Sequence, residues 1–333
     1  MNTVPRSSDM PRVAVLMAAC NGMQWLDEQI ASILHQEGVR VQLFISIDPS
    51  TDGTETFCRQ LAADDGRVAT LPGVGPGSPA GNFFRLMLEI PAGDYDFVAL
   101  ADQDDIWLPD KLASAILHMQ RHQAAGYSSS FTAFWPDGRQ TLMRKDHPQR
   151  RWDFLFESPG PGCSFVLTPP LHRAIQENLS ALDHPPASLI YHDVYIYAFA
   201  RANGYRWVID PHSRLLYRQH PDNAVGVNRG WRALWFRLQM ILTGHGLEQS
   251  LRMADAVGIG QSAFVRGWRR LDRGGIGFLL RHAWQCRRKP SHRLFFALVM
   301  IALWLRHGFV DSERQGAADR LILGARDKEE DKR

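Results

Sequence analysis

An uninterrupted apolar run, VAVLMAA over residues 13–19, stops abruptly at the turn residues Asn21 and Gly22. A run of this kind is typical of a strand that is buried on both faces, as strands of parallel sheets are. Residues 25–34 then carry apolar side chains at three- and four-residue spacing, which predicts a helix with one face on the sheet. A buried strand followed directly by an amphipathic helix constrains the chain to an α/β architecture.

The same order of strand, turn and helix repeats along the chain. A second strand is predicted over 41–48, and we expect Thr51 or Asp52 to cap the helix that follows it. Further strands are predicted over 67–71 and 95–101, with helices over 80–90 and 109–123. We therefore predict a Rossmann-like α/β domain with a mostly parallel central sheet and helices on both faces.

Charge divides the chain of 333 residues into two parts, although its net charge is only +3. Residues 228–333 hold 20 basic and 10 acidic side chains, whereas residues 1–227 carry a net charge of −7. The composition also changes after Val227, to Arg, Trp, Phe and Leu in helical periodicity. We predict a globular α/β domain over 1–227 and a basic, aromatic-rich helical extension over 228–333.

The cellular setting can be inferred from cysteines and apolar runs. The four cysteines are widely spaced and form no CxxC pair, which favours a reducing compartment. The N-terminal residues show no secretory signal pattern. The longest uncharged apolar run, over 294–305, has 12 residues, short of the roughly 20 needed to cross a bilayer. We expect a cytoplasmic protein without a membrane-spanning helix.

Carboxylates gather where the predicted strands end, which is where open α/β sheets bind ligands. Asp48 ends the second strand, and Asp102, Asp104 and Asp105 follow the strand over 95–101. An Asp-x-Asp pair at a strand end suits Mg²⁺ or Mn²⁺ together with a diphosphate. The pattern by itself also fits a solvated loop with a helix cap, and both interpretations stay open at this point.

Six short blocks in order give the sequence a family resemblance. They are AACNG (18–22), SIDPSTDGT (46–54), GNF (81–83), ADQDDIWLPDKL (101–112), YHDVYIYAFA (191–200) and YRQHPDN (217–223). Together they resemble the inverting glycosyltransferases of family 2, and within that family the bacterial rhamnosyltransferases. The resemblance spans about residues 12–227.

The resemblance implies a nucleotide site for a dTDP- or UDP-linked sugar. Ala18 and Asn21 match the block that lines the base and ribose, and Asp48 matches the carboxylate that accepts the imide N3–H of thymine or uracil. The sequence departs from the family at Cys20, where a Tyr is usual, and at Ile47, which replaces an acidic residue. Because of these departures, we expect a lower affinity for the nucleotide than is usual in the family.

The resemblance also implies a site for a metal ion and the donor diphosphate. Asp102 corresponds to a ribose and metal contact and Asp104 to the direct ligand of Mg²⁺ or Mn²⁺. Asn82 matches a sugar or diphosphate contact, with a helix cap as the alternative. Arg218 and His220 match a late block that approaches the diphosphate and the metal, with a structural histidine as the alternative to a ligand at 220.

An inverting transfer needs a base that takes the proton from the acceptor hydroxyl. Asp193, which follows His192 at the start of an aromatic helix, matches the base of the family, and a helix N-cap is a compatible second role. By contrast, we interpret Arg85 as a residue on a solvated helix face. His118 and His122 are four residues apart, and the sequence offers no third ligand near them. We therefore interpret them too as residues on a solvated helix face.

The resemblance implies transfer of a deoxyhexose, L-rhamnose from dTDP-L-rhamnose, to a saccharide hydroxyl in cell-surface polysaccharide or O-antigen assembly, with a lipid-linked acceptor. Basic side chains interleaved with Trp231, Trp235, Trp268 and Trp284 favour an anionic membrane at the inner face of the plasma membrane over a nucleic acid. A helical subdomain that only packs on the catalytic domain is the alternative. A non-catalytic nucleotide-sugar or saccharide-binding relative and a sugar-phosphate nucleotidyltransferase are the rival functions.

Overall fold

The computed structural model describes residues 10–182, 191–220 and 245–306, which form two compact units. Among these residues, the second unit comprises 149–156, 245–255 and 259–306, and the first unit comprises the rest. The boundary predicted at 227/228 lies outside the described residues, as do Trp231 and Trp235. Segment 149–156 thus belongs to the unit formed by the C-terminal helices, although it lies within the first 227 residues.

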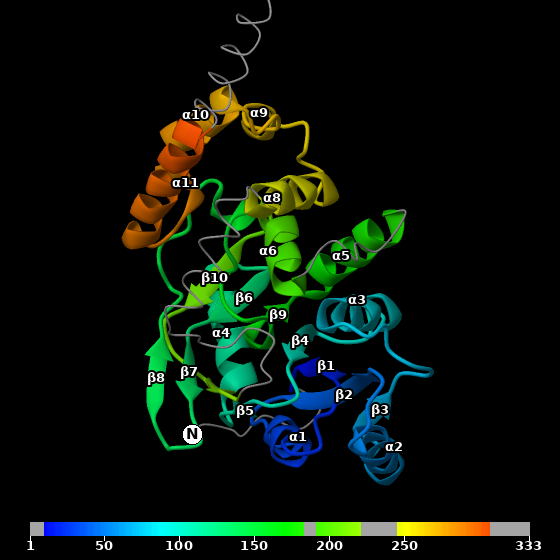
Figure 1. The fold of residues 1–333 in the computed structure, drawn as a ribbon. Helices are drawn as coiled ribbons and strands as arrows, with labels where there is room; N and C mark the ends of the chain where they lie inside the picture. Colours follow the sequence, from blue (N-terminus) through cyan, green and yellow to red (C-terminus); the bar gives the residue numbers. More distant parts are fainter. Residues whose placement is uncertain (1–9, 183–190, 221–244, 307–333) are drawn as a thin grey trace, which may run out of the picture. The chain divides into compact units, whose positions relative to one another are not determined.

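The first unit is built on a seven-stranded, mostly parallel sheet in the order β10-β6-β9-β4-β1-β2-β3 (Figure 1). Its strands are β1 (Arg12–Ala19), β2 (Arg40–Ile47), β3 (Val68–Thr70), β4 (Phe97–Ala101), β6 (Gly126–Ser129), β9 (Val166–Leu167) and β10 (Trp207–Asp210). Only β9, which lies between β4 and β6, runs antiparallel to its neighbours in this sheet. The mostly parallel α/β fold predicted from the apolar runs is confirmed.

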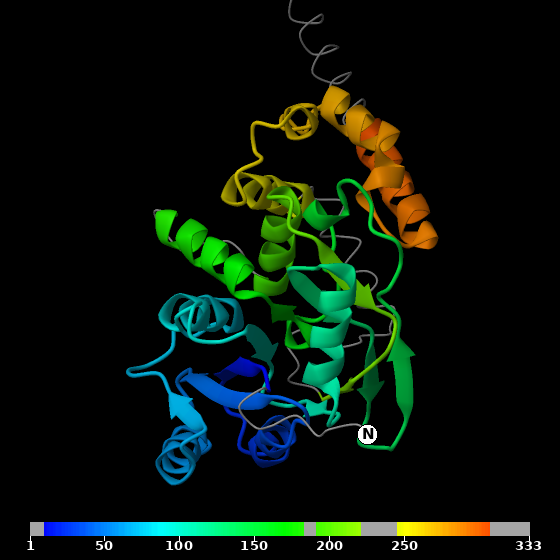
Figure 2. The same cartoon turned by 180° about the vertical axis from the view of Figure 1, so that it is seen from behind.

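Helices cover both faces of this sheet and can be followed in Figure 1 and, from behind, in Figure 2. They are α1 (Leu26–Leu34), α2 (Thr54–Asp64), α3 (Pro79–Glu89), α4 (Lys111–His122), α5 (Pro169–Ala181) and α6 (His192–Ala202). Successive residues of β1 point to opposite faces, yet all five from Val13 to Met17 have an exposed fraction of 0%. Both faces of the central strand are therefore closed to water.

A smaller four-stranded sheet pairs β11, a late strand, with β5, which follows β4 in the chain. It has the order β5-β11-β7-β8 and consists of β5 (Ile106–Trp107), β7 (Phe131–Phe134), β8 (Gln140–Met143) and β11 (Leu215–Arg218). Strands β7 and β8 form a hairpin, and Gly138 in its turn has φ 81°, a left-handed conformation that favours glycine. Because β11 pairs with β5, Arg218 is brought beside the carboxylates that follow β4.

The helix N-caps differ from those that the sequence predicts. The N-cap of α2 is Gly53 at φ 93°, not Thr51 or Asp52, although Asp52 still accepts a hydrogen bond from the backbone N–H of Thr54 at 3.0 Å. The cap of α3 is Ser78, so the cap interpretation of Asn82 is wrong. The N-cap position of α6 is occupied by Tyr191, which leaves Asp193 inside the first turn rather than at the cap.

The second unit is helical, as predicted for the C-terminal region. It contains α8 (His245–Ala256), α9 (Ala263–Arg266), α10 (Arg273–Arg281), α11 (Ala283–Cys286) and a helix over 290–306. Trp268 is fully buried in this unit, and Phe264 stacks on Trp152 with a centroid distance of 4.2 Å. The buried Arg288 pairs with Asp153 at 3.3 Å, which fastens segment 149–156 into the unit. Within the part of the chain that the model describes, no helix combines the length and the hydropathy that a membrane crossing requires.

Candidate active site

Gln103, between the two aspartates of the Asp-x-Asp pattern, joins the loops after β1 and β4 by hydrogen bonds. Gln103 donates from Nε2 to the carbonyl of Cys20 at 2.8 Å and accepts the Cys20 N–H at 2.7 Å. A Cβ at Gly22 would lie 2.4 Å from Gln103 Oε1, so a larger residue there would displace the Gln103 side chain. The buried Gln29 holds the carbonyl of Asp102 at 2.8 Å. The Asp-Gln-Asp-Asp loop is therefore rigidly placed at the carboxyl edge of the sheet.

Asn21 joins the loops after β1 and β2 by hydrogen bonds in the same way. Its side-chain Oδ1 accepts the backbone N–H of Thr51 at 2.8 Å, and its own N–H donates to Ser50 Oγ at 3.0 Å. The residue has φ 48°, a left-handed conformation that Asn tolerates better than most side chains. Ala18, paired with Ser46, is half-buried near the end of β1, directly after the fully buried residues 13–17. Both predicted nucleotide contacts thus lie at this edge.

Asp48 lines a pocket of about 240 Å³ directly after β2. The pocket is lined by Ile47, Asp48, Pro49, Ser50, Glu55, Gly73 and Val74. The Asp48 side chain accepts the backbone N–H of Gly77 at 2.8 Å, and burial raises the pKa of the carboxyl. Behind it, Asn82 donates from Nδ2 to the carbonyl of Ser46 at 3.0 Å. Asn82 also lies beside Asp48, and its side chain opposes the rise of the Asp48 pKa.

Arg85 is not the solvated helix residue that the sequence analysis assumed. Its guanidinium donates to Ser46 Oγ at 3.2 Å and to the carbonyl of Pro72, and it pairs with Glu89 at 2.8 Å. These contacts tie α3 to β2 and to the loop that begins at Pro72. Arg85 also places a positive charge close enough to Asp48 to oppose the rise of its pKa.

Asp104 and His220, which are 116 residues apart, meet with Nε2 of the imidazole 2.8 Å from Oδ2 of the carboxylate. The imidazole stacks on Trp25 with a centroid distance of 4.0 Å. Arg218 donates from Nε to the carbonyl of Asp104 at 2.9 Å, and its guanidinium also pairs with Glu28 at 2.5 Å. The predicted metal ligand and the predicted late block are therefore brought together.

Further acidic side chains are crowded close to Asp104. Ligand atoms of Asp102, Asp105 and Cys163 all lie within 4.8 Å of one another. Burial, together with the charges of Asp104 and Asp193, raises the pKa of Asp102 to about 7. Asp105 is fully buried, and burial beside the other carboxylates raises its pKa well above the usual range.

The residues fit a divalent cation. Oδ2 of Asp105 is buried and has no hydrogen-bond partner among the described residues, and a bound cation would offset the repulsion that helps to raise the pKa values of Asp102 and Asp105. Carboxylate oxygens suit Mg²⁺ and Mn²⁺, and an imidazole nitrogen is a common additional ligand for transition ions. Asp104 and His220 are in contact, and Asp102 lies in the cluster with Asp105 and Cys163, so both kinds of ligand are present at this edge of the sheet.

Asp193 lies in the first turn of α6, near this cluster. Its charge contributes to the raised pKa of Asp102, which places it within electrostatic reach of that carboxyl. The preceding His192 stacks on Phe83 with a centroid distance of 4.0 Å, and a Cβ at Gly162 would lie 2.2 Å from its Nε2. Burial lowers the pKa of His192 to about 4, so the imidazole is neutral at pH 7. The start of α6 is thereby fixed against α3 and the segment next to Cys163.

Comparison with known proteins agrees with this geometry. The family model described as Glycosyl transferase family 2 matches residues 14–178. The dTDP-rhamnosyl transferase RfbG of Shigella flexneri is 34% identical over 289 residues, which cover 86% of this chain and 99% of that protein. Two crystal structures of S. aureus TarS 1-349 share the fold, each with a TM-score of 0.51. The one in complex with UDP-GlcNAc is 13% identical to this chain and the other 15%, and each match covers 92% of this chain and 92% of the TarS chain. The chain belongs to glycosyltransferase family 2 and is a glycosyltransferase that uses a nucleotide-sugar donor.

Proposed function

We propose that this glycosyltransferase transfers L-rhamnose from dTDP-L-rhamnose to a saccharide hydroxyl, with inversion at the anomeric carbon, in the assembly of a cell-surface polysaccharide or O-antigen. The sugar and nucleotide are supported by the relative from Shigella flexneri, which is named a dTDP-rhamnosyl transferase. The observation that carries the site is the 2.8 Å contact of Asp104 with His220 at the edge of the sheet that also holds the Asp48 pocket. Family membership argues against the nucleotidyltransferase alternative.

The thymine base would occupy the pocket beside Asp48. One carboxylate oxygen of Asp48 already accepts the Gly77 N–H, and the other would accept the imide N3–H of the base. The half-buried Ala18 and the turn held by Asn21 would border the base and ribose. Asn82, whose Oδ1 has no hydrogen-bond partner among the described residues, would add a polar contact to the diphosphate or sugar.

Asp104, Asp102 and His220 would hold Mg²⁺ or Mn²⁺. Such an ion, when bound, neutralises the donor diphosphate and stabilises the charge on the leaving group. Arg218 lies against Asp104 through its Nε, so its guanidinium can shift from Glu28 to a phosphate oxygen. Because Gln103 and Gln29 fix the loop backbone, the carboxylates need little reorganisation when the donor binds.

Asp193 would act as the base. As the acceptor oxygen forms its bond to the anomeric carbon, the bond from that carbon to the diphosphate oxygen breaks, and the hydroxyl proton passes to the Asp193 carboxylate. The Asp193 carboxylate lies in the first turn of α6, at the positive end of the helix dipole. The neutral His192 next to it is held by Phe83 and does not compete for the proton.

Substitution of Asp193 tests this function. In Asp193→Asn we expect transfer to fall about 10²–10⁴-fold, the usual contribution of a general base, while dTDP and Mn²⁺ still bind. The matched control is Asp64→Asn at the exposed end of α2. Unimpaired transfer by Asp193→Asn would remove this residue as the base. A wild-type protein that binds dTDP but turns over no donor would instead be a non-catalytic binding relative.

We also propose that the second unit attaches the enzyme to the anionic inner face of the plasma membrane, where a lipid-linked acceptor would be found. The helix over 290–306 buries Phe296, Val299, Met300 and Leu303. Its opposite side exposes a second apolar stripe, formed by Leu294 (55% exposed), Leu298 (55%), Ile301 (41%) and Leu305 (49%). The exposed Lys289 and Arg306 flank the stripe. An apolar face with cations at both ends matches an anionic bilayer surface.

Vesicle sedimentation tests the attachment. Wild-type protein should sediment with phosphatidylglycerol vesicles and less with phosphatidylcholine vesicles, and Leu298→Asp should reduce sedimentation at least tenfold. Leu142→Asp in β8 replaces an equally exposed leucine of the first unit and should have no effect. Equal sedimentation of both variants, or a loss of self-association instead of vesicle binding in Leu298→Asp, would contradict the membrane as the occupant of the stripe.

A further inference from the structure

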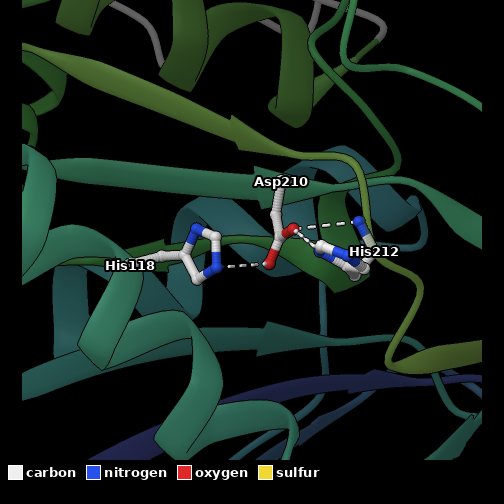
Figure 3. Close-up of side chains that lie close together, drawn as sticks. All are labelled: His118, Asp210 and His212. Atoms are coloured by element: carbon white, nitrogen blue, oxygen red, sulfur yellow. Dashed lines mark hydrogen bonds and ion pairs between the residues drawn. The ribbon is translucent and has the colours of Figure 1, made fainter.

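A buried carboxylate at the β10 edge of the sheet is bracketed by two imidazoles (Figure 3). Asp210, the last residue of β10, has an exposed fraction of 0%. Nδ1 of His212 lies 2.9 Å from Asp210 Oδ1, and Nε2 of His118, in α4, lies 3.4 Å from Asp210 Oδ2. The three side chains therefore come from a helix, a strand end and the loop after that strand. This corrects the interpretation of His118 as a solvated helix residue.

The carboxylate is held in place by groups that do not move with the imidazoles. Tyr127, fully buried in β6, donates its hydroxyl to Asp210 Oδ2 at 3.0 Å. The backbone N–H of His212 donates to Oδ1 at 2.9 Å. Metal-ligating carboxylates typically have such outer hydrogen bonds, which orient them and tune their basicity. Asp210 is thus already oriented toward the space between the two histidines.

We propose that His118, Asp210 and His212 form a second metal site, for a borderline divalent transition ion such as Zn²⁺, separate from the Mg²⁺ or Mn²⁺ site of the transfer reaction. Two imidazole nitrogens and one carboxylate oxygen suit Zn²⁺, Ni²⁺ or Co²⁺ better than Mg²⁺. Of the side chains that the model describes, these three form a cluster whose ligand atoms all lie within 4.8 Å of one another.

The distances allow an ion to enter with a small adjustment. A tetrahedral ion with bonds of about 2.0–2.1 Å holds its ligand atoms roughly 3.3–3.5 Å apart. The separation of His118 from Asp210 is already 3.4 Å, which is longer than a good N–H···O hydrogen bond. The His212 side chain is 67% exposed and can turn to complete the set. Three protein ligands leave a fourth position of a tetrahedral ion for water.

Such an ion would fasten parts of the fold that lead to the active site. It would join α4 to the connection between β10 and β11, and β11 ends at Arg218. The site therefore stabilises the segment that delivers Arg218 and His220, without contacting the donor. Its loss would weaken metal and donor binding only indirectly.

The proposal is tested by Zn²⁺ titration of the full chain. We use Asp104→Ala/His220→Ala as the background, because it removes two of the three proposed ligands of the other site. This background should bind one equivalent of Zn²⁺ and gain thermal stability. Adding His118→Gln and His212→Gln should weaken the binding at least 100-fold and abolish the Zn²⁺-dependent gain, and Co²⁺ should show its tetrahedral absorption bands only when both histidines are present.

His122→Gln in the same background is the matched control. This exposed histidine lies one turn along α4, with its ring centroid 6.1 Å from that of His118, and its loss should leave Zn²⁺ affinity within threefold. The partly exposed histidines are chosen rather than the buried Asp210 so that the variants fold; circular dichroism without metal checks this. Unchanged Zn²⁺ affinity in the folded His118→Gln/His212→Gln variant would overturn the proposal. An equal loss in His122→Gln would do the same.

Discussion

The two ends of the main sheet treat buried carboxylates in opposite ways. Beyond β1, β2 and β4, Asp102 and Asp105 crowd together and their pKa values are raised by burial and by one another. At the other end, Asp210 is equally buried but accepts hydrogen bonds from Tyr127 and from the backbone of His212, with two imidazoles beside it. The first arrangement disfavours the ionised form of its carboxyls, whereas the second surrounds its carboxylate with hydrogen-bond donors.

The difference indicates what each end can bind. A crowded carboxylate cluster attracts a hard cation that must be exchanged together with an anionic diphosphate, as a transfer reaction requires. A carboxylate between imidazoles favours a softer ion that stays bound. The donor end is accordingly surrounded by loops held by side chains such as Gln103 and Asn21, whereas the β10 end is held by a strand and a helix.

The largest expected effect is on transferase activity, which should depend on the donor end of the sheet far more than on the β10 end. Asp104→Ala should reduce kcat/KM on the order of 10³-fold, because stabilisation of the leaving diphosphate by the metal is lost. Donor turnover at saturating Mn²⁺ measures this. His118→Gln should reduce kcat/KM less than tenfold, because it does not touch the donor. Comparable losses in both variants would break the distinction between the two ends.

A smaller effect is expected at the base pocket. Asp48→Asn keeps the shape of the side chain but presents an amide N–H to the imide N3–H, so dTDP affinity should fall about 10–100-fold, as for a hydrogen bond to a charged group. Calorimetry with dTDP and its N3-methyl derivative measures it. Wild-type protein should discriminate against the methylated base and the variant should not. If both proteins bind the two nucleotides alike, Asp48 does not read the base.

The smallest effect is a pH dependence confined to the donor end. The pKa of Asp102 is raised in the folded protein from 3.8 to about 7, so the folded state holds an extra proton between these values. The stability from this group is present below pH 3.8 and is lost as the pH rises through 7. Because an ion needs the carboxylate, Mn²⁺ affinity should rise up to about tenfold per pH unit below pH 7 and level off above it.

Asp102→Asn is the control for this dependence. It should flatten both the loss of stability between pH 4 and 7 in the absence of metal and the rise in Mn²⁺ affinity. Chemical denaturation and Mn²⁺ titration at several pH values measure the two quantities. A wild-type protein whose stability increases over this range through Asp102 would contradict the raised pKa.

Much of the fold follows from short-range patterns. The apolar runs before Asn21 and Asp48 predict two buried strands, and strand ends predict where the carboxylates gather. Helix caps were missed because several residues in each turn, Thr51 and Asp52 among them, have the chemistry of a cap, and only the backbone angle at Gly53 decides.

What the sequence does not disclose depends on contacts between distant residues. The role of Gln103 requires the loop after β1 to lie beside it, and Arg85 becomes structural only because Pro72 and Ser46 face it. His118 and Asp210 are 92 positions apart and meet because α4 packs on β10. No local signal marks these residues, although Asp104 and His220 were found because their sequence blocks resemble a known family.

A crystal structure of the protein soaked with dTDP and Mn²⁺, with anomalous data at the manganese edge, tests the central claim most directly. We predict a manganese peak between Asp104 Oδ2 and His220 Nε2, with the diphosphate on the ion and thymine N3 at the Asp48 carboxylate. A manganese peak at His118 and Asp210 with none at Asp104, or a nucleotide bound away from Asp48, would contradict the assignment of the donor site to the carboxyl ends of β1, β2 and β4.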